Sequence, residues 1–174
     1  MSENGNTEKR EKLVRRALEE FEARLIGYAA SILRDADRAR DVVQDTFIKL
    51  YGQDPGKVEG ALKAWLFTVC RNRCLDILRK EKRMENIEQE QVVQIHDKTE
   101  DPSRLAERSD EHSKVMRFLE RLPENQKEVL RLKFQGEMSY KEISEVTSLS
   151  VSNVGFLIHA GLKRLRGMLS HQAA

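Results

Sequence analysis

The chain has 174 residues, enough for one good hydrophobic core or two small ones. Charged residues make up 34% of the sequence and aromatic residues 6%, with 9 glycines and 3 prolines, which favours helices with broad solvated faces over a sheet. No apolar run approaches the roughly 20 residues of a membrane span. The polar residues 1–12 contain no apolar signal region, so we expect a cytoplasmic protein without membrane insertion.

The net charge of +2 conceals three blocks of different charge. Residues 1–83 carry 18 basic and 14 acidic side chains, residues 84–111 carry 3 and 9, and residues 112–174 carry 10 and 6. Two mildly basic blocks therefore flank an acidic connector. This pattern suits two modules that meet a polyanion, and a solvated surface would tolerate it as well.

Three amphipathic helices are predicted in the first block. Apolar residues recur at helical spacing over about residues 9–33, from Asp35 or Asp37 to about residue 51, and over about residues 61–82. The segment 52–60, which contains proline and glycine, is predicted to be a loop. Helices of this length pack into one small bundle.

The second of these helices has a polar face opposite its apolar one. This face consists of Asp41, Gln44, Asp45, Ile48 and Lys49. Two carboxylates might indicate acid–base chemistry, but nothing nearby supplies a nucleophile, a metal or a pocket. The face therefore fits a docking surface for another protein better.

The third helix ends in a run of basic residues, which comprises Arg71, Arg73, Arg79, Lys80, Lys82 and Arg83. Such a helix end neutralises phosphates, and Asn72 offers a side chain that reads a base edge. The alternative is a solvated helix end, because cations also suit the helix dipole there. Trp65 adds aromatic surface for stacking on single-stranded bases, although its place on the apolar face favours core packing.

Cys70 and Cys74 are the only cysteines, and they are four residues apart on the third helix. This spacing supplies half of a metal site, whereas a structural zinc requires four ligands. The histidines show no pairing pattern; they are His96, His112, His159 and His171. Two small buried apolar residues are the favoured interpretation, with no metal and no cofactor. A cytoplasmic thiol or metal sensor is the alternative.

Residues 84–106 lose the helical regularity and are rich in Glu and Gln, with a break at Asp101-Pro102-Ser103. We interpret them as an extended acidic linker, in which Val92, Val93 and Ile95 offer a short docking segment. The second module is predicted to begin near Leu105.

The second module contains a first helix that ends at Leu122-Pro123, a helix over about residues 124–135, and a pair of helices joined by a tight turn. Ser139 and Glu142 form a capping box before the first helix of the pair, and Ser150 caps the second. The pair shares an apolar interior of Ile143, Val146, Leu149, Val151, Val154, Ile158, Leu162 and Leu165. This is the geometry that places a second helix in the DNA major groove, and an ordinary antiparallel helical pair is the alternative.

The exposed face of that second helix is predicted to read DNA. Opposite a buried stripe of Val151, Val154 and Ile158, the expected exposed stripe is Ser152, Phe156, His159 and Lys163. Phe156 and Leu157 are predicted to be exposed, where they would meet thymine methyl groups or a protein partner. The complete set of predicted contacts is Ser150, Ser152, Asn153, Phe156, His159, Lys163 and Arg164.

At this point two segments of the chain resemble a known family. DVVQDTFIKLY (41–51) with AWLFTVCRNRCLDILRK (64–80) is similar to region two of the extracytoplasmic-function sigma factors of bacterial RNA polymerase. LERLPENQKEVLRLKFQGEMSYKEISEVTSLSVSNV (119–154) is similar to their region four. The matches cover most of residues 20–83 and 108–170, in the family's order.

The resemblance implies an all-α protein of two small helical domains: a region-two domain over 9–83, an acidic linker over 84–107 and a region-four domain over 108–170. The second-helix face would dock on the clamp helices of the largest polymerase subunit. The loop and third helix would recognise and melt the minus-ten element through Trp65, Arg71, Asn72, Arg73, Arg79 and Lys80. The helix-turn-helix would read the minus-thirty-five element. The linker would enter the active-site cleft and exit channel.

These features predict an alternative sigma factor, not an enzyme, whose partners are core RNA polymerase, promoter DNA and an anti-sigma factor. A free-standing helix-turn-helix regulator that reads a palindrome as a homodimer is the rival, and no coiled-coil heptad supports it. Two departures from the family pattern stand out. Basic residues do not alternate along residues 155–160, and Ser148 stands where the turn often has glycine, at a cost of roughly 1 kcal/mol if its backbone is left-handed.

Overall fold

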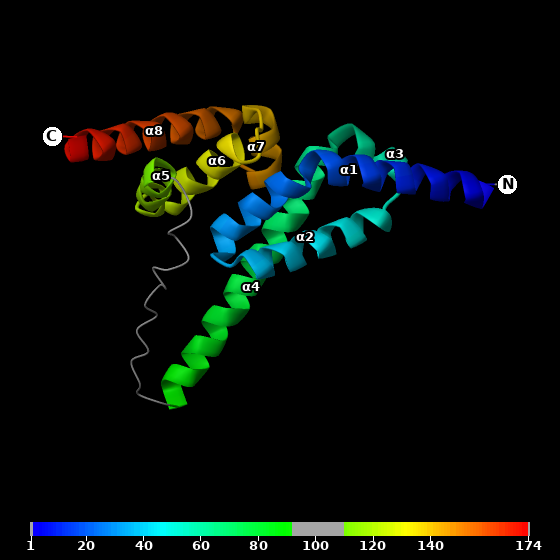
Figure 1. Ribbon diagram of the computed structural model, residues 1–174, viewed down its shortest axis with the longest axis horizontal. Helices are drawn as coiled ribbons and strands as arrows, with labels where there is room; N and C mark the ends of the chain where they lie inside the picture. The colour runs from blue at the N-terminus through cyan, green and yellow to red at the C-terminus, as the bar shows by residue number, and fades with distance from the viewer. Residues whose placement is uncertain (1, 92–109, 174) are drawn as a thin grey trace.

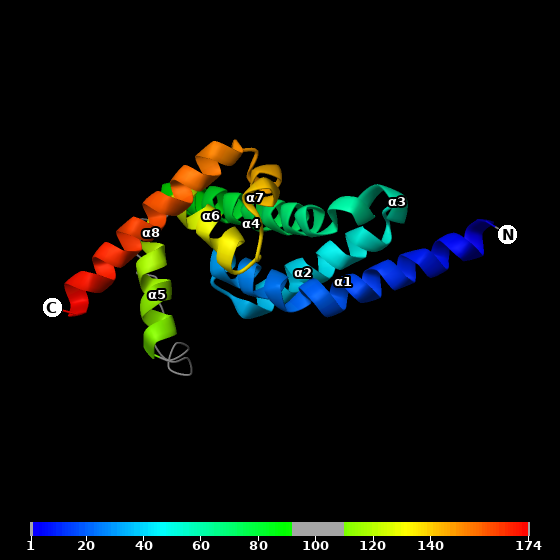
Figure 2. The ribbon, with the colours of Figure 1, turned by 90° about the horizontal axis from the view of Figure 1, so that it is seen from above.

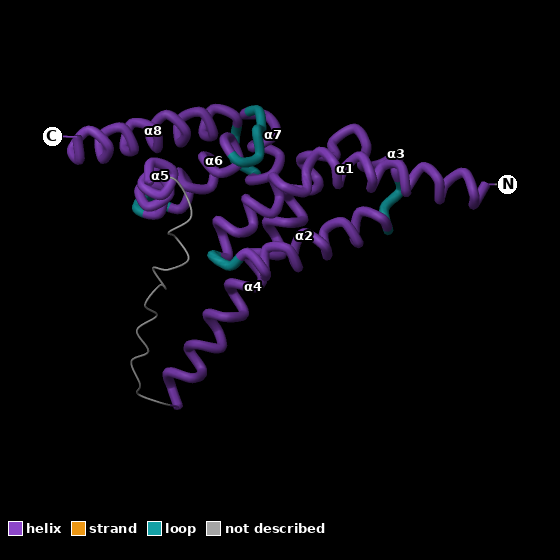
Figure 3. Tube along the Cα trace, in the orientation of Figure 1, coloured by secondary structure: helices purple, strands orange, loops and turns teal. Residues whose placement is uncertain are grey.

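The computed structural model describes residues 2–91 and 110–173, and the regular structure within these ranges is helical (Figure 3). The N-terminal module contains α1 (Ser2–Leu33), α2 (Ala36–Tyr51), α3 (Pro55–Val58), a 3-10 turn over Glu59–Ala61, and α4 (Leu62–Gln91). The C-terminal module contains α5 (Asp110–Glu120), α6 (Glu124–Phe134), α7 (Tyr140–Thr147) and α8 (Val151–Ala173). Figures 1 and 2 show the two modules side by side, with α7 against α4. Side-chain hydrogen bonds of Glu128 join α6 to α1 and α4.

The second predicted helix begins where the sequence places it. The Asp35 carboxylate accepts hydrogen bonds from the backbone N–H groups of Asp37, at 3.0 Å, and Arg38, at 3.2 Å. This satisfies two of the donors that a helix start leaves without partners. The apolar face of α2 is then buried against α1 and α4, as predicted.

Three boundaries of the N-terminal module differ from the prediction. Helix α1 begins at Ser2 rather than near Lys9. The expected loop 52–60 contains α3, which Asp54 caps and Pro55 opens, because a proline at the first helical position loses no hydrogen bond. Helix α4 continues to Gln91, into the expected linker. Val92, Val93 and Ile95 lie outside the described residues.

The helix-turn-helix pair forms as predicted. The Ser139 hydroxyl accepts from the N–H of Glu142 at 3.2 Å, and the Glu142 carboxylate accepts from the N–H of Ser139 at 3.0 Å. The Ser150 hydroxyl accepts from the N–H of Asn153 at 3.1 Å and so caps α8. Ser148 ends α7 with φ of 62°, in the left-handed region.

Two residues of α8 were assigned to the wrong face. Val151 is 48% exposed, whereas Leu157 is only 6% exposed and packs in the core. The buried stripe runs instead through Val154, Leu157, Ile158 and Gly161. At Gly161 the helix lies so close to α6 that an added Cβ would stand 2.8 Å from the Leu130 Cδ1 atom. Because glycine has no side chain, the pattern of apolar residues does not mark position 161 as buried.

One apolar core extends through both modules. Its buried members include Leu25 and Phe67 from the N-terminal module, and Leu132, Met138 and Ile143 from the C-terminal module. No helix in the described ranges is long and apolar enough to cross a membrane.

The left-handed backbone of Ser148 yields a stability prediction. We expect Ser148→Gly to raise the free energy of unfolding by about 0.5–1 kcal/mol, because glycine adopts this conformation without a Cβ clash. Ser152→Gly, in the right-handed backbone of α8, is the matched control and should lower it by a few tenths of a kcal/mol. Urea unfolding followed by circular dichroism measures both, and a loss of stability in Ser148→Gly would contradict the prediction.

Candidate nucleic-acid interface

The predicted reading face of α8 is open to solvent. Every predicted contact on it is exposed, namely Ser150, Ser152, Asn153, Phe156, His159, Lys163 and Arg164. Phe156 is 69% exposed, although phenylalanine normally buries its ring. The opposite face of the helix lies on α6 and α7, so α8 is held firmly while this stripe faces outward. The arrangement is that of a helix that enters a groove.

The polar face of α2 is also exposed. Asp41, Gln44, Asp45 and Lys49 are solvent-accessible, and Ile48 among them is 71% exposed. An apolar side chain ringed by polar ones on a rigid helix suits contact with another protein.

Some residues of the basic end of α4 are exposed to solvent, and some of its arginines form ion pairs. Asn72, Arg73, Arg79 and Lys80 are exposed along α4. Arg79 pairs with Asp76 at 3.2 Å, and the Arg73 Nε atom lies 3.9 Å from the Asp45 carboxylate. Trp65 is half-buried against the core, which agrees with the packing role that its face favours.

Arg71 differs from the other predicted minus-ten residues because it faces the C-terminal module. Its Nε donates to the Glu128 Oε1 atom at 2.7 Å. The Tyr28 hydroxyl donates to the same oxygen at 2.8 Å, and Tyr28 is fully buried. Burial and the Glu128 charge raise the pKa of Tyr28 well above its usual value, so it remains a donor. Arg71 therefore joins the modules in this structure and is not part of an open basic patch.

Sequence reasoning missed these contacts between the modules. Lys63 pairs with Glu142 at 3.1 Å, Arg24 with Glu137 at 2.9 Å, and Arg34 with Glu120 at 2.5 Å. The two residues of each pair are far apart along the chain, so no local sequence pattern predicts that they interact. The one feature of the sequence that hints at these ion pairs is the high number of charged residues on helices that also have an apolar face.

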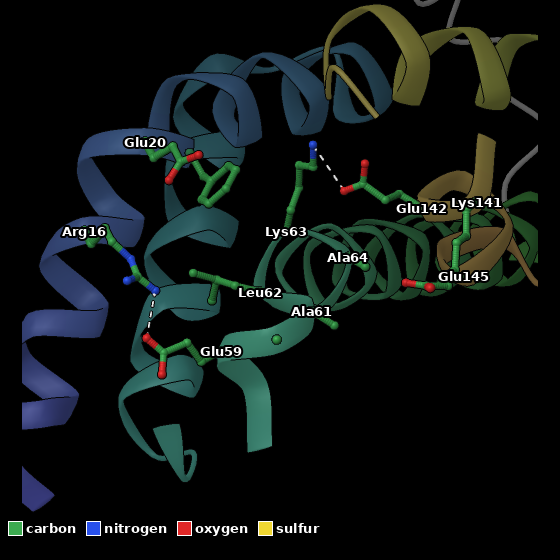
Figure 4. Close-up of a pocket in the computed structure, with 12 residues that line it drawn as sticks. Arg16, Glu20, Glu59, Ala61, Leu62, Lys63, Ala64, Lys141, Glu142 and Glu145 are labelled. Atoms are coloured by element: carbon green, nitrogen blue, oxygen red, sulfur yellow. Dashed lines mark hydrogen bonds and ion pairs between the residues drawn. The ribbon is translucent and has the colours of Figure 1, made fainter. Parts of the chain in front are cut away.

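A cleft of about 440 Å³ lies at this junction, between α1, the start of α4, and α7 (Figure 4). Its charged walls are already partly paired, through Lys63 with Glu142 and through Arg16 with Glu59 at 3.2 Å. Both signs of charge line it in similar number, which does not favour an anionic or a cationic ligand.

The two cysteines are buried on α4, as the favoured interpretation predicts. A hydrogen bond with Cys74 and burial raise the pKa of the Cys70 thiol, whereas the same hydrogen bond lowers the pKa of Cys74. Among the described residues, no cluster of three or more His, Cys, Asp or Glu side chains is arranged to hold a metal ion. His96 lies outside the described residues.

Comparison with known proteins gives consistent matches in both modules. The family described as "Sigma-70 region 2" matches residues 17–84, and "Sigma-70, region 4" matches residues 112–165. The ECF RNA polymerase sigma factor RpoE of Cereibacter sphaeroides is 30% identical over 132 residues, which cover 76% of this chain and 70% of that protein. The ECF RNA polymerase sigma factor SigM of Bacillus subtilis is 26% identical over 142 residues, which cover 81% of this chain and 85% of that protein.

Two solved structures share the fold. CnrH, in complex with the cytosolic domain of CnrY, has a TM-score of 0.65 and 23% identity, and the match covers 92% of this chain and 90% of CnrH. The sigma factor RpoE, in complex with the anti-sigma factor NepR from Bartonella quintana, has a TM-score of 0.59 and 24% identity, with coverage of 84% and 89%.

The ion-pair network between the modules yields a pH prediction. Burial would raise the pKa of Glu120, but the Arg34 hydrogen bond and the charges of Arg34, Lys127 and Arg131 hold it below the usual 4.5. A lowered carboxyl pKa stabilises the fold above pH 4.5, and this contribution is lost as the pH falls through the folded-state value.

We therefore expect Glu120→Gln to lower the free energy of unfolding at pH 7 by up to about 1 kcal/mol, and to lower it much less at pH 3. Glu11→Gln, on an exposed face of α1, is the control and should change stability at pH 7 by less than about 0.5 kcal/mol. Urea unfolding at both pH values decides, and an equal loss at both would count against the network.

Proposed function

The chain belongs to the extracytoplasmic-function (ECF) sigma factors of the sigma-70 family, and we propose that it binds core RNA polymerase and directs it to promoters through three helical surfaces. It is a transcription initiation factor, and we propose that it acts in the cytoplasm as a dissociable subunit with no catalytic activity of its own. The observation that carries the proposal is the exposed α8 stripe, presented by a capped helix-turn-helix.

The α2 face is the proposed dock for core polymerase. The side chains of Asp41, Gln44, Asp45, Ile48 and Lys49 lie on one face of a helix whose other face is buried. Because the buried face of α2 is held in the core, we expect α2 to keep its position when these side chains bind another protein. The resemblance to region two indicates the clamp helices of the largest subunit as the partner.

The proposed minus-ten contacts lie on α4. Asn72, Arg73, Arg79 and Lys80 supply donors and charge to a separated strand, and Trp65 stands at the edge of the core beside them. Arg71 joins this set once it is released from Glu128. The acidic linker, proposed to enter the active-site cleft and exit channel, falls largely outside the described residues.

The rival interpretation, a free-standing helix-turn-helix regulator, accounts for one module only. Family matches to both modules in the order of the sigma-70 family favour the sigma factor. Since RpoE and CnrH were solved with NepR and the cytosolic domain of CnrY, we also propose that an anti-sigma factor binds this chain.

The polymerase dock is tested by the double variant Gln44→Ala, Asp45→Ala. We expect at least about tenfold weaker binding to core polymerase, because each of the two lost polar contacts contributes about 0.5–1.5 kcal/mol and about 1.4 kcal/mol corresponds to a factor of ten. The fold should be retained, since exposed substitutions usually stay within about 0.5 kcal/mol. Glu19→Ala, Glu22→Ala on α1 is the control. Titration of labelled protein with core enzyme measures the affinity, and undiminished binding would refute the assignment.

The reading face of α8 is tested by selection from randomised upstream elements. We expect Ser152→Ala and Asn153→Ala to relax sequence preference, by about 1–3 kcal/mol where the contact is bidentate. Lys163→Ala and Arg164→Ala should instead weaken binding to all sequences alike, as lost phosphate contacts do. Identical preferences in wild type and the variants at 152, 153 and 156 would show that α8 does not read bases.

Phe156→Ala separates two uses of the exposed ring. If Phe156 meets a thymine methyl group, promoter activity falls while anti-sigma binding is retained. If it meets an anti-sigma factor, inhibition is lost while promoter activity is retained.

A further inference from the structure

The first three turns of α8 differ in chemistry from the turns that follow. Residues 151–162 contain no lysine, arginine, aspartate or glutamate. The exposed side chains of this stretch are two apolar groups, two small polar groups and one imidazole, namely Val151, Phe156, Ser152, Asn153 and His159. Basic side chains begin at Lys163 and continue with Arg164 and Arg166, all of which are exposed. Helix α8 therefore has an N-terminal part without Lys or Arg and a C-terminal basic part.

This division assigns different DNA contacts to the two parts. In a helix-turn-helix, residues near the start of the second helix contact base edges. Contacts to phosphates position the protein and carry no sequence information directly, and the basic part suits them. Guanine is most often read by the forked donors of Arg or by Lys, and the amino group of cytosine by a carboxylate. Residues 151–162 supply none of these groups.

Phe156 is the most protruding apolar group on the exposed stripe. Its side chain is 69% exposed. Its neighbours on the helix surface, three and four positions away, all have shorter side chains, namely Ser152, Asn153, His159 and Ala160. The apolar group that a base pair offers in the major groove is the C5-methyl group of thymine. The same stripe continues to Lys163, so a helix that sets Lys163 on a phosphate directs the ring into the groove.

Asn153 supplies the matching polar contact. Its backbone N–H donates to the Ser150 hydroxyl at 3.1 Å, which fixes the first turn while the side-chain amide stays exposed. An asparagine amide pairs with N6 and N7 of adenine through two hydrogen bonds. Because Asn153 and Phe156 are three residues apart, they are neighbours on the helix surface. Adenine and the thymine methyl group both belong to A·T pairs.

We propose that α8 reads A·T base pairs without a guanine contact: Phe156 meets a thymine methyl group and Asn153 pairs with adenine, while Lys163 and Arg164 hold phosphates. The proposal rests on the proposed function, in which this helix reads the upstream promoter element. The two base contacts carry no charge and release no counterions. The ratio of the affinities for two sequences should therefore stay constant as salt rises, although each affinity falls.

The test uses the full-length chain bound to core RNA polymerase. The complex selects duplexes from a library that is randomised at both promoter elements, and we expect the enriched upstream element to consist of A·T pairs. In that element each thymine is then replaced singly by uracil, which lacks only the C5-methyl group. Each adenine is replaced singly by 7-deazaadenine, which lacks the N7 acceptor. One uracil should weaken binding about fourfold, the value of one buried methyl group. One 7-deazaadenine should weaken it about two- to tenfold.

Variants assign each effect to a side chain. Phe156→Ala should lose the sensitivity to uracil and keep the sensitivity to 7-deazaadenine, and Asn153→Ala should show the reverse. Phe134→Ala is the matched control, because it removes a phenylalanine of α6 that is 61% exposed. It should respond to both replacements as the wild type does. Since the base replacements leave the protein unchanged, a folding defect of a variant does not mimic the wild-type result.

An enriched upstream element anchored on G·C pairs would overturn the proposal, as would a guanine preference that His159→Ala removes. A wild-type affinity that no uracil changes would also overturn it, and would leave Phe156 as a contact for a protein partner. In both cases the complex still selects promoters, so the proposed function stands. A complex that enriches no sequence at all would refute the proposed function, and this inference with it.

Discussion

The arrangement of the two modules depends on the half-buried carboxylate of Glu128. A charge at such a depth requires hydrogen-bonding partners, because desolvation is costly for an ion without them. Arg71 and Tyr28 supply them from two helices of the N-terminal module, at 2.7 and 2.8 Å. Since Glu128 is fixed on α6, its contacts set where α6 lies on α1 and α4. Helices α7 and α8 pack on α6, so the reading face of α8 is oriented through the same contact.

The apolar core explains why the modules meet closely. Each module alone would have a small core, because a small domain buries a smaller fraction of its surface than a larger one does. Phe67 of α4 reaches the turn between α6 and α7, where an added Cβ on Gly136 would stand 3.3 Å from its ring. Met138, from the same turn, is fully buried. Contact between the modules thus completes the burial of side chains from both.

The sequence predicted best what is local. Helix caps such as Asp35 and Ser150 are recognised because side chain and backbone partner lie within three residues. The end of α4 was missed since Glu, Gln and Lys are good helix formers that continue a helix without apolar periodicity. The contacts of Glu128 were not predictable, because Arg71 and Tyr28 are 57 and 100 residues away and the pairing follows no periodic pattern.

The chemistry of the junction also indicates how firmly it holds. Partly exposed ion pairs contribute only about 0–1 kcal/mol each, because water and salt compete with them. Pairs at the rim, such as Arg24 with Glu137, therefore bias the balance between arrangements, whereas the apolar core shared by the two modules supplies most of the buried contact. A partner that binds one arrangement about a hundredfold better than the other changes the equilibrium by about 2.7 kcal/mol, which is of the same order. The exposed face of α2 lies away from these pairs, so a protein that docks there first is able to shift the balance before DNA is engaged.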